Sequence, residues 1–317
     1  MSDQLDVVTV GELLGVISAF HLNAPLESAT LLEKSTGGSE VNVALGLARL
    51  GHRVGWAGAV GDDPFGREGV KLLRGAGVDV SRVVVSPSAP TGIYFKQLLA
   101  LSGLRNYPYR DTSAARRWEA TDVDVAYLLS GRVLHLTGIT ASISPSGHRL
   151  VRDLMTRSRS GPVHVSFDAN LRSNLLRGRD PVSLLAPLAR EADTVFLSRT
   201  EAASLFSTAD PEGLQSLLPQ MRVTTMITHD SQGAHAVTRD GIHWVAARTV
   251  QPVDPTGAGD AFVVGYLHGL LAQAPIAVRL ELAEHCAAQT VSTRGDSAVT
   301  LALPAESPSS ADTVDER

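Results

Sequence analysis

Apolar runs and helix-type patterns alternate along most of the chain. Short runs rich in Val, Leu, Ile and Phe, each typical of a buried strand, occur at residues 6–11, 53–61, 131–138, 162–170, 193–198 and 224–229. Helical patterns stand between most of them. In residues 39–51, for example, Val41, Leu45 and Ala48 share one face and Gly51 marks the C-terminal end. Buried strands that alternate with helices predict a mostly parallel sheet covered on both faces.

Two stretches interrupt this alternation. Residues 12–36 carry no clear helical pattern, and residues 91–110 predict two strands around a Ser-Gly turn with no helix between them. These extended segments predict a small sheet that stands off the main one. The polar end of the chain, residues 307–317, predicts a disordered tail.

Length and composition narrow the class of protein. A chain of 317 residues is near the upper size for one hydrophobic core, which favours one large domain, residues 1–306. The net charge of -5 contains no block of like charge, so neither a nucleic acid nor an anionic membrane surface is an expected partner. Cys286 is the only cysteine, which excludes an internal disulfide and suits a cytoplasmic protein. The N-terminus lacks a signal-peptide pattern, and no apolar run approaches the roughly 18 residues of a membrane span.

The stretch DPTGAGDAF, residues 254–262, carries the strongest chemical signal. A dinucleotide-binding loop would need a third glycine and an early position in the chain. A plain helix start with an acid in its first turn is a common arrangement. The third interpretation is a phosphate site, in which backbone N–H groups of the glycine turn point at an anion. Asp260 repels phosphate, so its presence makes sense if it takes a proton from an attacking hydroxyl group.

This stretch resembles the C-terminal signature of the ribokinase-type carbohydrate kinases, the PfkB family. GGSEVNVALGLARLG, which begins at Gly37, and GAVGDDPFG, residues 58–66, resemble further signatures of that family. The resemblance covers residues 5 to about 300. It implies an α/β three-layer sandwich with a mostly parallel central sheet and a β-strand lid, formed by residues of about 12–36 and 90–112. It also implies ATP-dependent phosphorylation of a sugar hydroxyl group, with Mg²⁺ on the nucleotide.

The same resemblance assigns roles to individual residues. It makes Asp260 the catalytic base, with an anion hole formed by Gly257, Ala258 and Gly259. The residues that it places at ATP are Asn170, Ser198, Thr228, Asp230, Gly233, Gly257 and Gly259. Glu201 takes an indirect role in Mg²⁺ binding, and Asp254 lies where related enzymes often bind a monovalent cation such as K⁺ through nearby backbone. Ser198 stands where the family has an asparagine, and His229 beside Asp230 is interpreted as part of a polar turn.

The residues expected at the sugar are Gly37, Gly38, Asn42, Tyr94, Arg110 and Arg172. The two arginines suit a carboxylate, because a guanidinium group can donate paired hydrogen bonds to it. TGIYF, YRDTSAA and DANLR resemble the corresponding stretches of 2-keto-3-deoxygluconate kinases. Pro108 departs from that pattern, since those enzymes have a tyrosine there, and it removes a backbone donor from the strand.

The favoured function is therefore phosphorylation of 2-keto-3-deoxygluconate by ATP, which gives 2-keto-3-deoxy-6-phosphogluconate. The alternatives are a fructokinase, another ketohexose kinase or a nucleoside kinase of the same family. An alternative of another class is a sensor that binds sugar or nucleotide without turnover, against which the intact Asp260 and glycine turn argue. A homodimer through the lid is expected, because apolar lid residues such as Ile93, Phe95 and Leu98 need a partner surface.

Overall fold

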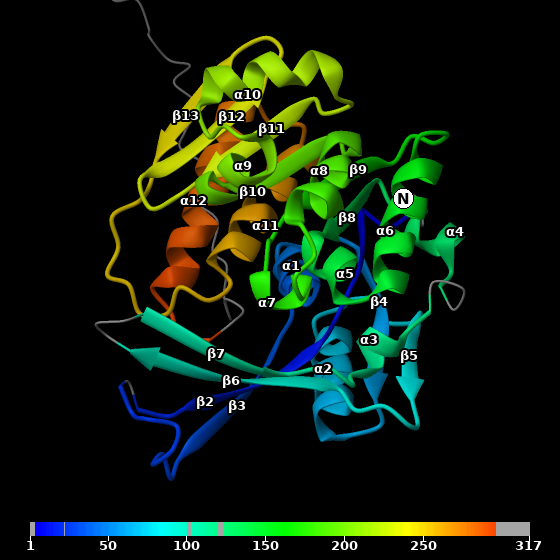
Figure 1. Ribbon diagram of the computed structural model, residues 1–317, viewed down its shortest axis with the longest axis vertical. Helices are drawn as coiled ribbons and strands as arrows, with labels where there is room; N and C mark the ends of the chain where they lie inside the picture. Colours follow the sequence, from blue (N-terminus) through cyan, green and yellow to red (C-terminus); the bar gives the residue numbers. More distant parts are fainter. Residues whose placement is uncertain (1–3, 22, 100–102, 120–122, 296–317) are drawn as a thin grey trace, which may run out of the picture.

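A mostly parallel sheet runs through the centre of the molecule (Figure 1). The computed structural model describes residues 4–21, 23–99, 103–119 and 123–295; the expected tail and the expected domain end at residue 306 lie outside them. Within these residues the sheet has nine strands, in the order β13 (Ile242–Ala246), β12 (Gly233–Thr238), β11 (Thr225–His229), β10 (Thr194–Ser198), β9 (His164–Asp168), β8 (Val133–Thr137), β1 (Val7–Val10), β4 (Val54–Gly61) and β5 (Val83–Ser86). Neighbouring strands from β11 to β5 pair in parallel, and β12 and β13 add an antiparallel edge.

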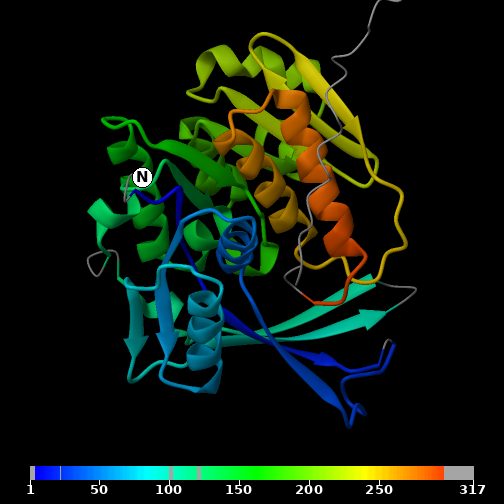
Figure 2. The same ribbon diagram turned by 180° about the vertical axis from the view of Figure 1, so that it is seen from behind.

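Helices cover both faces of this sheet, as Figures 1 and 2 show from opposite sides. One face carries α5 (Gly138–Ile143), α6 (Pro145–Ser158), α8 (Pro181–Glu191), α9 (Arg199–Phe206) and α10 (Pro211–Leu217). The other face carries α1 (Ser39–Arg49), α2 (Pro64–Gly75), α11 (Ala258–Leu271) and α12 (Ile276–Val291). The connections contain α3 (Ala114–Arg117), α4 (Val125–Leu128), α7 (Ser173–Leu176) and the 3₁₀ turn η2 (Leu218–Gln220). The expected three-layer sandwich is confirmed, and no helix of the described residues is long and apolar enough to cross a membrane.

Successive strand residues point to opposite faces and supply two separate cores. In β10, Val195 belongs to the core beneath α6 and α8, whereas Phe196 belongs to the core beneath α1 and α11. The Phe196 ring packs edge-on against Phe262 and Tyr266 of α11, with ring centroids 6.4 and 5.4 Å apart. This aromatic contact holds α11 on the sheet, and with it the glycine turn that precedes the helix.

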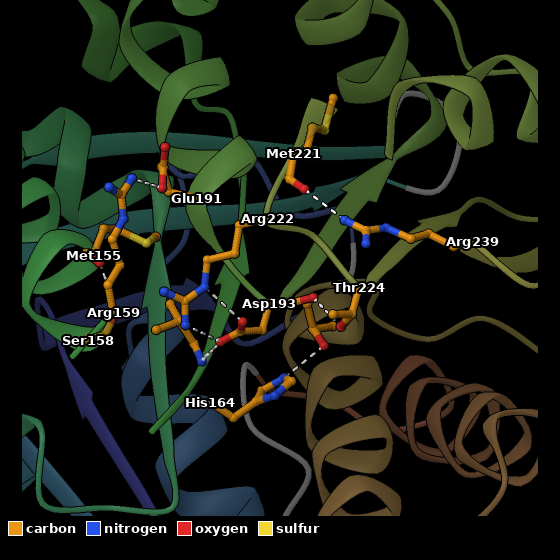
Figure 3. A network of polar contacts seen from close by, with 12 residues as sticks. Met155, Ser158, Arg159, His164, Glu191, Asp193, Met221, Arg222, Thr224 and Arg239 are labelled. Atoms are coloured by element: carbon orange, nitrogen blue, oxygen red, sulfur yellow. Dashed lines mark hydrogen bonds and ion pairs between the residues drawn. The ribbon is translucent and has the colours of Figure 1, made fainter. Parts of the chain in front are cut away.

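A polar network lies at the amino ends of β9, β10 and β11 (Figure 3). Asp193, just before β10, accepts hydrogen bonds from Arg222 Nε at 2.9 Å and from the backbone N–H of Val165 in β9 at 2.7 Å. Thr224 Oγ1 donates to the carbonyl oxygen of Asp193 at 2.9 Å. Because these bonds tie the amino ends of three parallel strands together, the carboxyl ends also meet at one edge, where ligands of such sheets gather.

A smaller sheet lies apart from the central one, at the bottom of the view in Figure 1. Among the described residues it has four strands in the order β3 (Leu32–Gly37), β2 (Leu14–Ala19), β6 (Gly92–Leu99) and β7 (Gly103–Tyr109). β2 pairs antiparallel with β3 and parallel with β6, and β6 pairs antiparallel with β7. Pro108 lies opposite Tyr94 in the edge strand β7, and edge strands tolerate proline because they have a neighbouring strand on one side only. This sheet is the expected β-strand lid.

The first turn of α1 is anchored to the carboxyl end of β8 by a buried acid, Glu40. Its Oε1 accepts hydrogen bonds from Thr137 Oγ1 and Thr140 Oγ1, both at 2.6 Å. A Cβ atom on Gly11 would lie 2.2 Å from the carboxyl carbon of Glu40, so only glycine allows this approach. Burial raises the pKa of Glu40 to about 7; the threonine hydrogen bonds act against this rise, and the charge of Asp260 adds to it.

This burial predicts a pH-dependent effect of Glu40→Gln. The folded protein keeps the Glu40 proton at pH values where the unfolded chain has lost it, so the wild type loses stability as pH rises from 4.5 to about 7. Glutamine does not titrate and can still accept from the threonines. The stability of the variant relative to the wild type should rise across this range by about 1–3 kcal/mol.

Urea unfolding at pH 5 and pH 8 measures this difference. Glu281→Gln, on an exposed position of α12, is the matched control. A stability difference between Glu40→Gln and the wild type that is the same at both pH values would contradict the burial argument.

Candidate active site

Asp260 lies in the first turn of α11 and is held by the first turn of α1. Ser39 Oγ donates to Asp260 Oδ1 at 2.6 Å, and Asn42 Nδ2 donates to Oδ2 at 2.7 Å. Burial raises the pKa of Asp260, while these two hydrogen bonds and the charge of Arg172 act in the opposite direction. The result is a carboxylate fixed in position by donors that lie more than 200 residues away in the sequence.

The turn before Asp260 has the shape of an anion site. Gly257 caps α11 with φ of 78°, in the left-handed region that favours glycine. A Cβ atom on Gly259 would meet no atom within 4 Å, so this residue borders open space. The first N–H groups of a helix have no partners within the helix. Of the predicted anion-hole donors, Ala258 directs its N–H toward the carbonyl oxygen of Pro255 at 3.3 Å.

Two adjoining cavities share this turn. A cavity of about 490 Å³ is lined on one side by Asp168, Asn170, Ser198, Glu201 and His229. A cavity of about 140 Å³ is lined by Gly38, Asn42, Tyr94, Arg110 and Asn174. The residues common to both linings are Asn106, Arg172, Thr256, Gly257 and Asp260. Asp260 therefore lies at the junction of a larger and a smaller binding space.

The residues expected at ATP divide into two groups. Asn170, Ser198, Gly257 and Gly259 line the larger cavity. Thr228, Asp230 and Gly233 are not among the described residues that line either cavity.

Asp230 and Gly233 instead close the turn between β11 and β12. The N–H of Asp230 donates to the carbonyl oxygen of Gly233 at 3.0 Å. His229, expected only as part of the turn, lines the larger cavity and stacks on Phe262 with ring centroids 5.1 Å apart. Burial lowers the pKa of His229, which favours the neutral ring.

Acidic groups gather on the wall of the larger cavity. Glu201 joins the ends of two strands: its Oε1 accepts the N–H of Leu171 at 2.5 Å, and its Oε2 accepts the N–H and the hydroxyl group of Ser198 at 2.7 and 2.9 Å. Ser198 thus forms a capping box with Glu201 at the start of α9.

Asp168, at the carboxyl end of β9, is missing from the residues that the sequence predicted. Burial, followed by the charges of Glu201 and Asp260, raises its pKa well above the usual range. The signal that could have found it is its place at the end of a predicted strand, two residues before Asn170.

Arg110, which lines the smaller cavity, forms a buried ion pair with Glu12. Glu12 also accepts a hydrogen bond from Ser113 Oγ at 2.7 Å. Gly38 has φ of 123°, and a Cβ atom there would lie 2.2 Å from the backbone oxygen of Glu12. Gly37 ends β3 and pairs with Leu14 of β2. Arg110 thus already has an acidic partner, which the sequence did not indicate.

Arg172 differs from Arg110 in its surroundings. It is exposed, it lines both cavities, and its charge acts on Asp168 and Asp260. No ion-pair partner of Arg172 is found among the described residues. Its guanidinium group is therefore open to an anionic ligand.

Asp254, beside which the family resemblance implies a monovalent cation, forms an ion pair with a lysine of the lid. Asp254 is fully buried, and its Oδ2 accepts a hydrogen bond from Lys96 Nζ of β6 at 2.8 Å. Thr256 donates to Oδ1 through its N–H at 3.0 Å and through its hydroxyl group at 2.7 Å. These contacts do not fit a bound K⁺ at this carboxylate.

Comparison with known proteins gives a consistent family. Residues 4–302 match the family described as pfkB family carbohydrate kinase. A 2-dehydro-3-deoxygluconokinase from Thermoproteus tenax is 34% identical over 308 residues, which cover 92% of this chain and 90% of that protein. A 5-dehydro-2-deoxygluconokinase from Geobacillus kaustophilus is 29% identical, over 94% of this chain and 92% of that protein.

A solved structure of similar fold has a nucleotide bound. It is an Escherichia coli protein, provisionally described as ribokinase II, in complex with ATP and Mg²⁺. It superposes with a TM-score of 0.85 at 25% identity, over 92% of this chain and 94% of that one. The fold, the glycine turn with Asp260 and the match over almost the whole chain agree, and the chain belongs to the pfkB family of carbohydrate kinases.

Proposed function

We propose that this chain transfers the γ-phosphate of ATP to a hydroxyl group of a small sugar acid. The favoured substrate is 2-keto-3-deoxygluconate, also called 2-dehydro-3-deoxygluconate, and the product is 2-keto-3-deoxy-6-phosphogluconate. One observation carries the proposal: the Asp260 carboxylate lies at the junction of the two cavities, beside the glycine turn. Phosphoryl transfer requires this arrangement, because the acceptor hydroxyl and the phosphate must meet beside a base and an anion site.

In the proposed reaction Asp260 accepts the proton of the substrate hydroxyl group as its oxygen attacks the γ-phosphorus. The bond between that phosphorus and the bridging oxygen breaks, and ADP leaves. Burial makes Asp260 a stronger base than an exposed aspartate, and the Ser39 and Asn42 donors keep the carboxylate oriented. The N–H groups at the start of α11 stabilise the charge on the transferring phosphate.

The larger cavity is the proposed site of Mg²⁺-ATP. The complex of the E. coli relative with ATP and Mg²⁺ supports this assignment. No group of acidic, histidine and cysteine residues in the described chain is arranged to hold a metal by itself. Mg²⁺ usually binds through one or two carboxylates plus substrate phosphates, and when bound it neutralises phosphate charge. Asp168 and Glu201 would hold it, Glu201 through water, because its oxygens already accept hydrogen bonds.

The smaller cavity is the proposed site of the sugar acid. The two relatives named above are kinases of dehydro-deoxygluconates, which carry a carboxylate group. Arg172 is the proposed partner of that carboxylate, because Arg110 is already paired with Glu12. Asn42, Tyr94, Asn106 and Asn174 line the same space and would contact the hydroxyl groups.

An ADP-release assay against a panel of sugar acids, neutral ketohexoses and nucleosides tests the proposal. Turnover of sugar acids above all other compounds is expected. Preferred turnover of fructose or a nucleoside would replace the proposed substrate. Sugar-acid binding without any ADP release would instead indicate a sensor.

Asp260→Asn tests the catalytic base. The substitution keeps size and shape but removes the proton acceptor, so kcat should fall roughly 10²–10⁴-fold with little change in substrate affinity. The exposed Asp240→Asn, in the turn between β12 and β13, is the control and should keep wild-type kcat. If Asp260 were only a helix cap, the variant would keep its activity and lose about 0.3–1 kcal/mol of stability.

Arg172→Ala tests the recognition of the carboxylate. Loss of a charge-assisted hydrogen bond of about 1.5–3 kcal/mol should lower kcat/KM for the sugar acid by roughly 10- to 150-fold and leave that for fructose unchanged. Arg177→Ala is the control, because Arg177 pairs with Asp111 and does not line either cavity in the described structure. An unchanged KM of Arg172→Ala for the sugar acid would remove Arg172 from substrate recognition.

The proposal includes the cytoplasmic location expected from the sequence and a homodimer through the lid. Phe20, Leu31, Leu32 and Tyr109 on or beside the lid strands are 49–65% exposed, and such apolar side chains are typical of an interface. Light scattering at micromolar concentration should give twice the chain mass of 33.5 kDa. Replacing Leu31 and Leu32 together by lysine should give the monomer mass. A monomeric wild type would contradict the dimer.

A further inference from the structure

A lysine of the lid is buried against the loop that leads into the glycine turn. Lys96 in β6 and Asp254 form an ion pair at 2.8 Å, with 3% and 0% of their side chains exposed. No other ion pair among the described residues is this deeply buried. A single buried charge of this kind is costly without a partner, so each of the two side chains depends on the other.

The carboxylate of Asp254 is saturated with donors. In the part of the chain that the structure describes, Oδ1 accepts two hydrogen bonds from Thr256, and Oδ2 accepts one from Lys96 and one from the N–H of Gly295 at 3.2 Å. A carboxylate offers about four lone-pair positions. All four are therefore used, and none is left to coordinate a metal ion.

The pair also joins three parts of the molecule. Lys96 belongs to the lid, Thr256 precedes the glycine turn, and Gly295 follows α12. The N–H of Asp254 donates to the carbonyl oxygen of Val291, the last residue of α12, at 3.1 Å. Burial on its own raises the pKa of Asp254, but the hydrogen bonds from Lys96 and Thr256 and the charge of Lys96 outweigh it and lower the pKa below the ordinary value.

We propose that the ammonium group of Lys96 takes the place of the monovalent cation that the family resemblance implies at Asp254. A lysine ammonium group is a compact single charge with three donors, so it supplies the charge that K⁺ would supply. The lid thereby provides a positioning residue for the loop that presents the anion-binding N–H groups. The enzyme then needs no added monovalent cation.

Two substitutions separate charge from shape. Lys96→Ala removes the ammonium group and opens space for an ion, whereas Lys96→Met removes the charge but fills the space. Lys34→Met is the matched control. Lys34 is a half-exposed lid residue whose Nζ lies 3.8 Å from Glu68 Oε2. The double variant Lys96→Ala with Asp254→Asn removes both charges, so no carboxylate remains to attract a cation.

Kinase rates are measured in choline chloride, NaCl and KCl at equal ionic strength. The wild type and Lys34→Met should give the same rate in all three salts. Lys96→Ala should lose on the order of 10- to 100-fold in kcat/KM in choline chloride, because the anion-binding loop is no longer held in place. K⁺ should restore part of the lost kcat/KM of Lys96→Ala, with a saturating dependence on its concentration, and should not restore the activity of Lys96→Met or of the double variant.

Thermal unfolding gives a second measurement that does not depend on catalysis. The kinetic measurements rest on the proposed function, but the Tm of Lys96→Ala should rise with KCl more than with choline chloride in any case, since an ion that binds only the folded state stabilises it. The Tm of the wild type should respond equally to both salts. Specific activation or stabilisation of the wild type by K⁺ would overturn the proposal. A Lys96→Ala variant whose kcat/KM and Tm do not respond to any monovalent cation would also overturn it.

Discussion

The contact between the first turns of α1 and α11 is the interaction on which the site depends. Ser39 and Asn42 each donate to one oxygen of Asp260, so the carboxylate has one orientation. Both helices lie on the same face of the sheet and begin near the carboxyl ends of its parallel strands. The two N-termini place positive partial charge around a buried acid and leave room for a phosphate beside it.

Charge balance supports the proposed placement of a nucleotide with its metal ion in the larger cavity. Asp168, Glu201 and Asp260 are close enough for the latter two to raise the pKa of Asp168. Backbone N–H groups satisfy Glu201, and Arg172 offsets part of the charge. An ATP molecule alone would add further negative charge to this wall, whereas a nucleotide that arrives with Mg²⁺ brings the compensating charge with it.

Local patterns in the sequence predicted most helices and strands of the central sheet. The features that they did not predict depend on contacts that a local pattern does not contain. The parallel strands other than β5 were predictable because each is a short apolar run between helices, and the start of α11 because Gly257 needs a left-handed conformation. β5 is a partly exposed edge strand and was not among the predicted runs. The antiparallel edge of β12 and β13 was not predicted, since its pairing depends on a turn held by Asp230 and Gly233. Asp168, Glu12 and Lys96 were missed because their partners lie far away in the sequence.

The lid has a part in the site that its extended pattern alone does not reveal. The paired strands β6 and β7 bring Tyr94, Lys96 and Asn106 close together. Their side chains nevertheless have different surroundings. Tyr94 lines the smaller cavity and Asn106 lines both, whereas Lys96 reaches past them to Asp254 beneath the glycine turn. A displacement of β6 would therefore change the smaller cavity and the support of the glycine turn together. In the proposed reaction the strand beside the acceptor hydroxyl would also support the N–H groups that receive the phosphate, which would couple the position of β6 to the geometry of transfer.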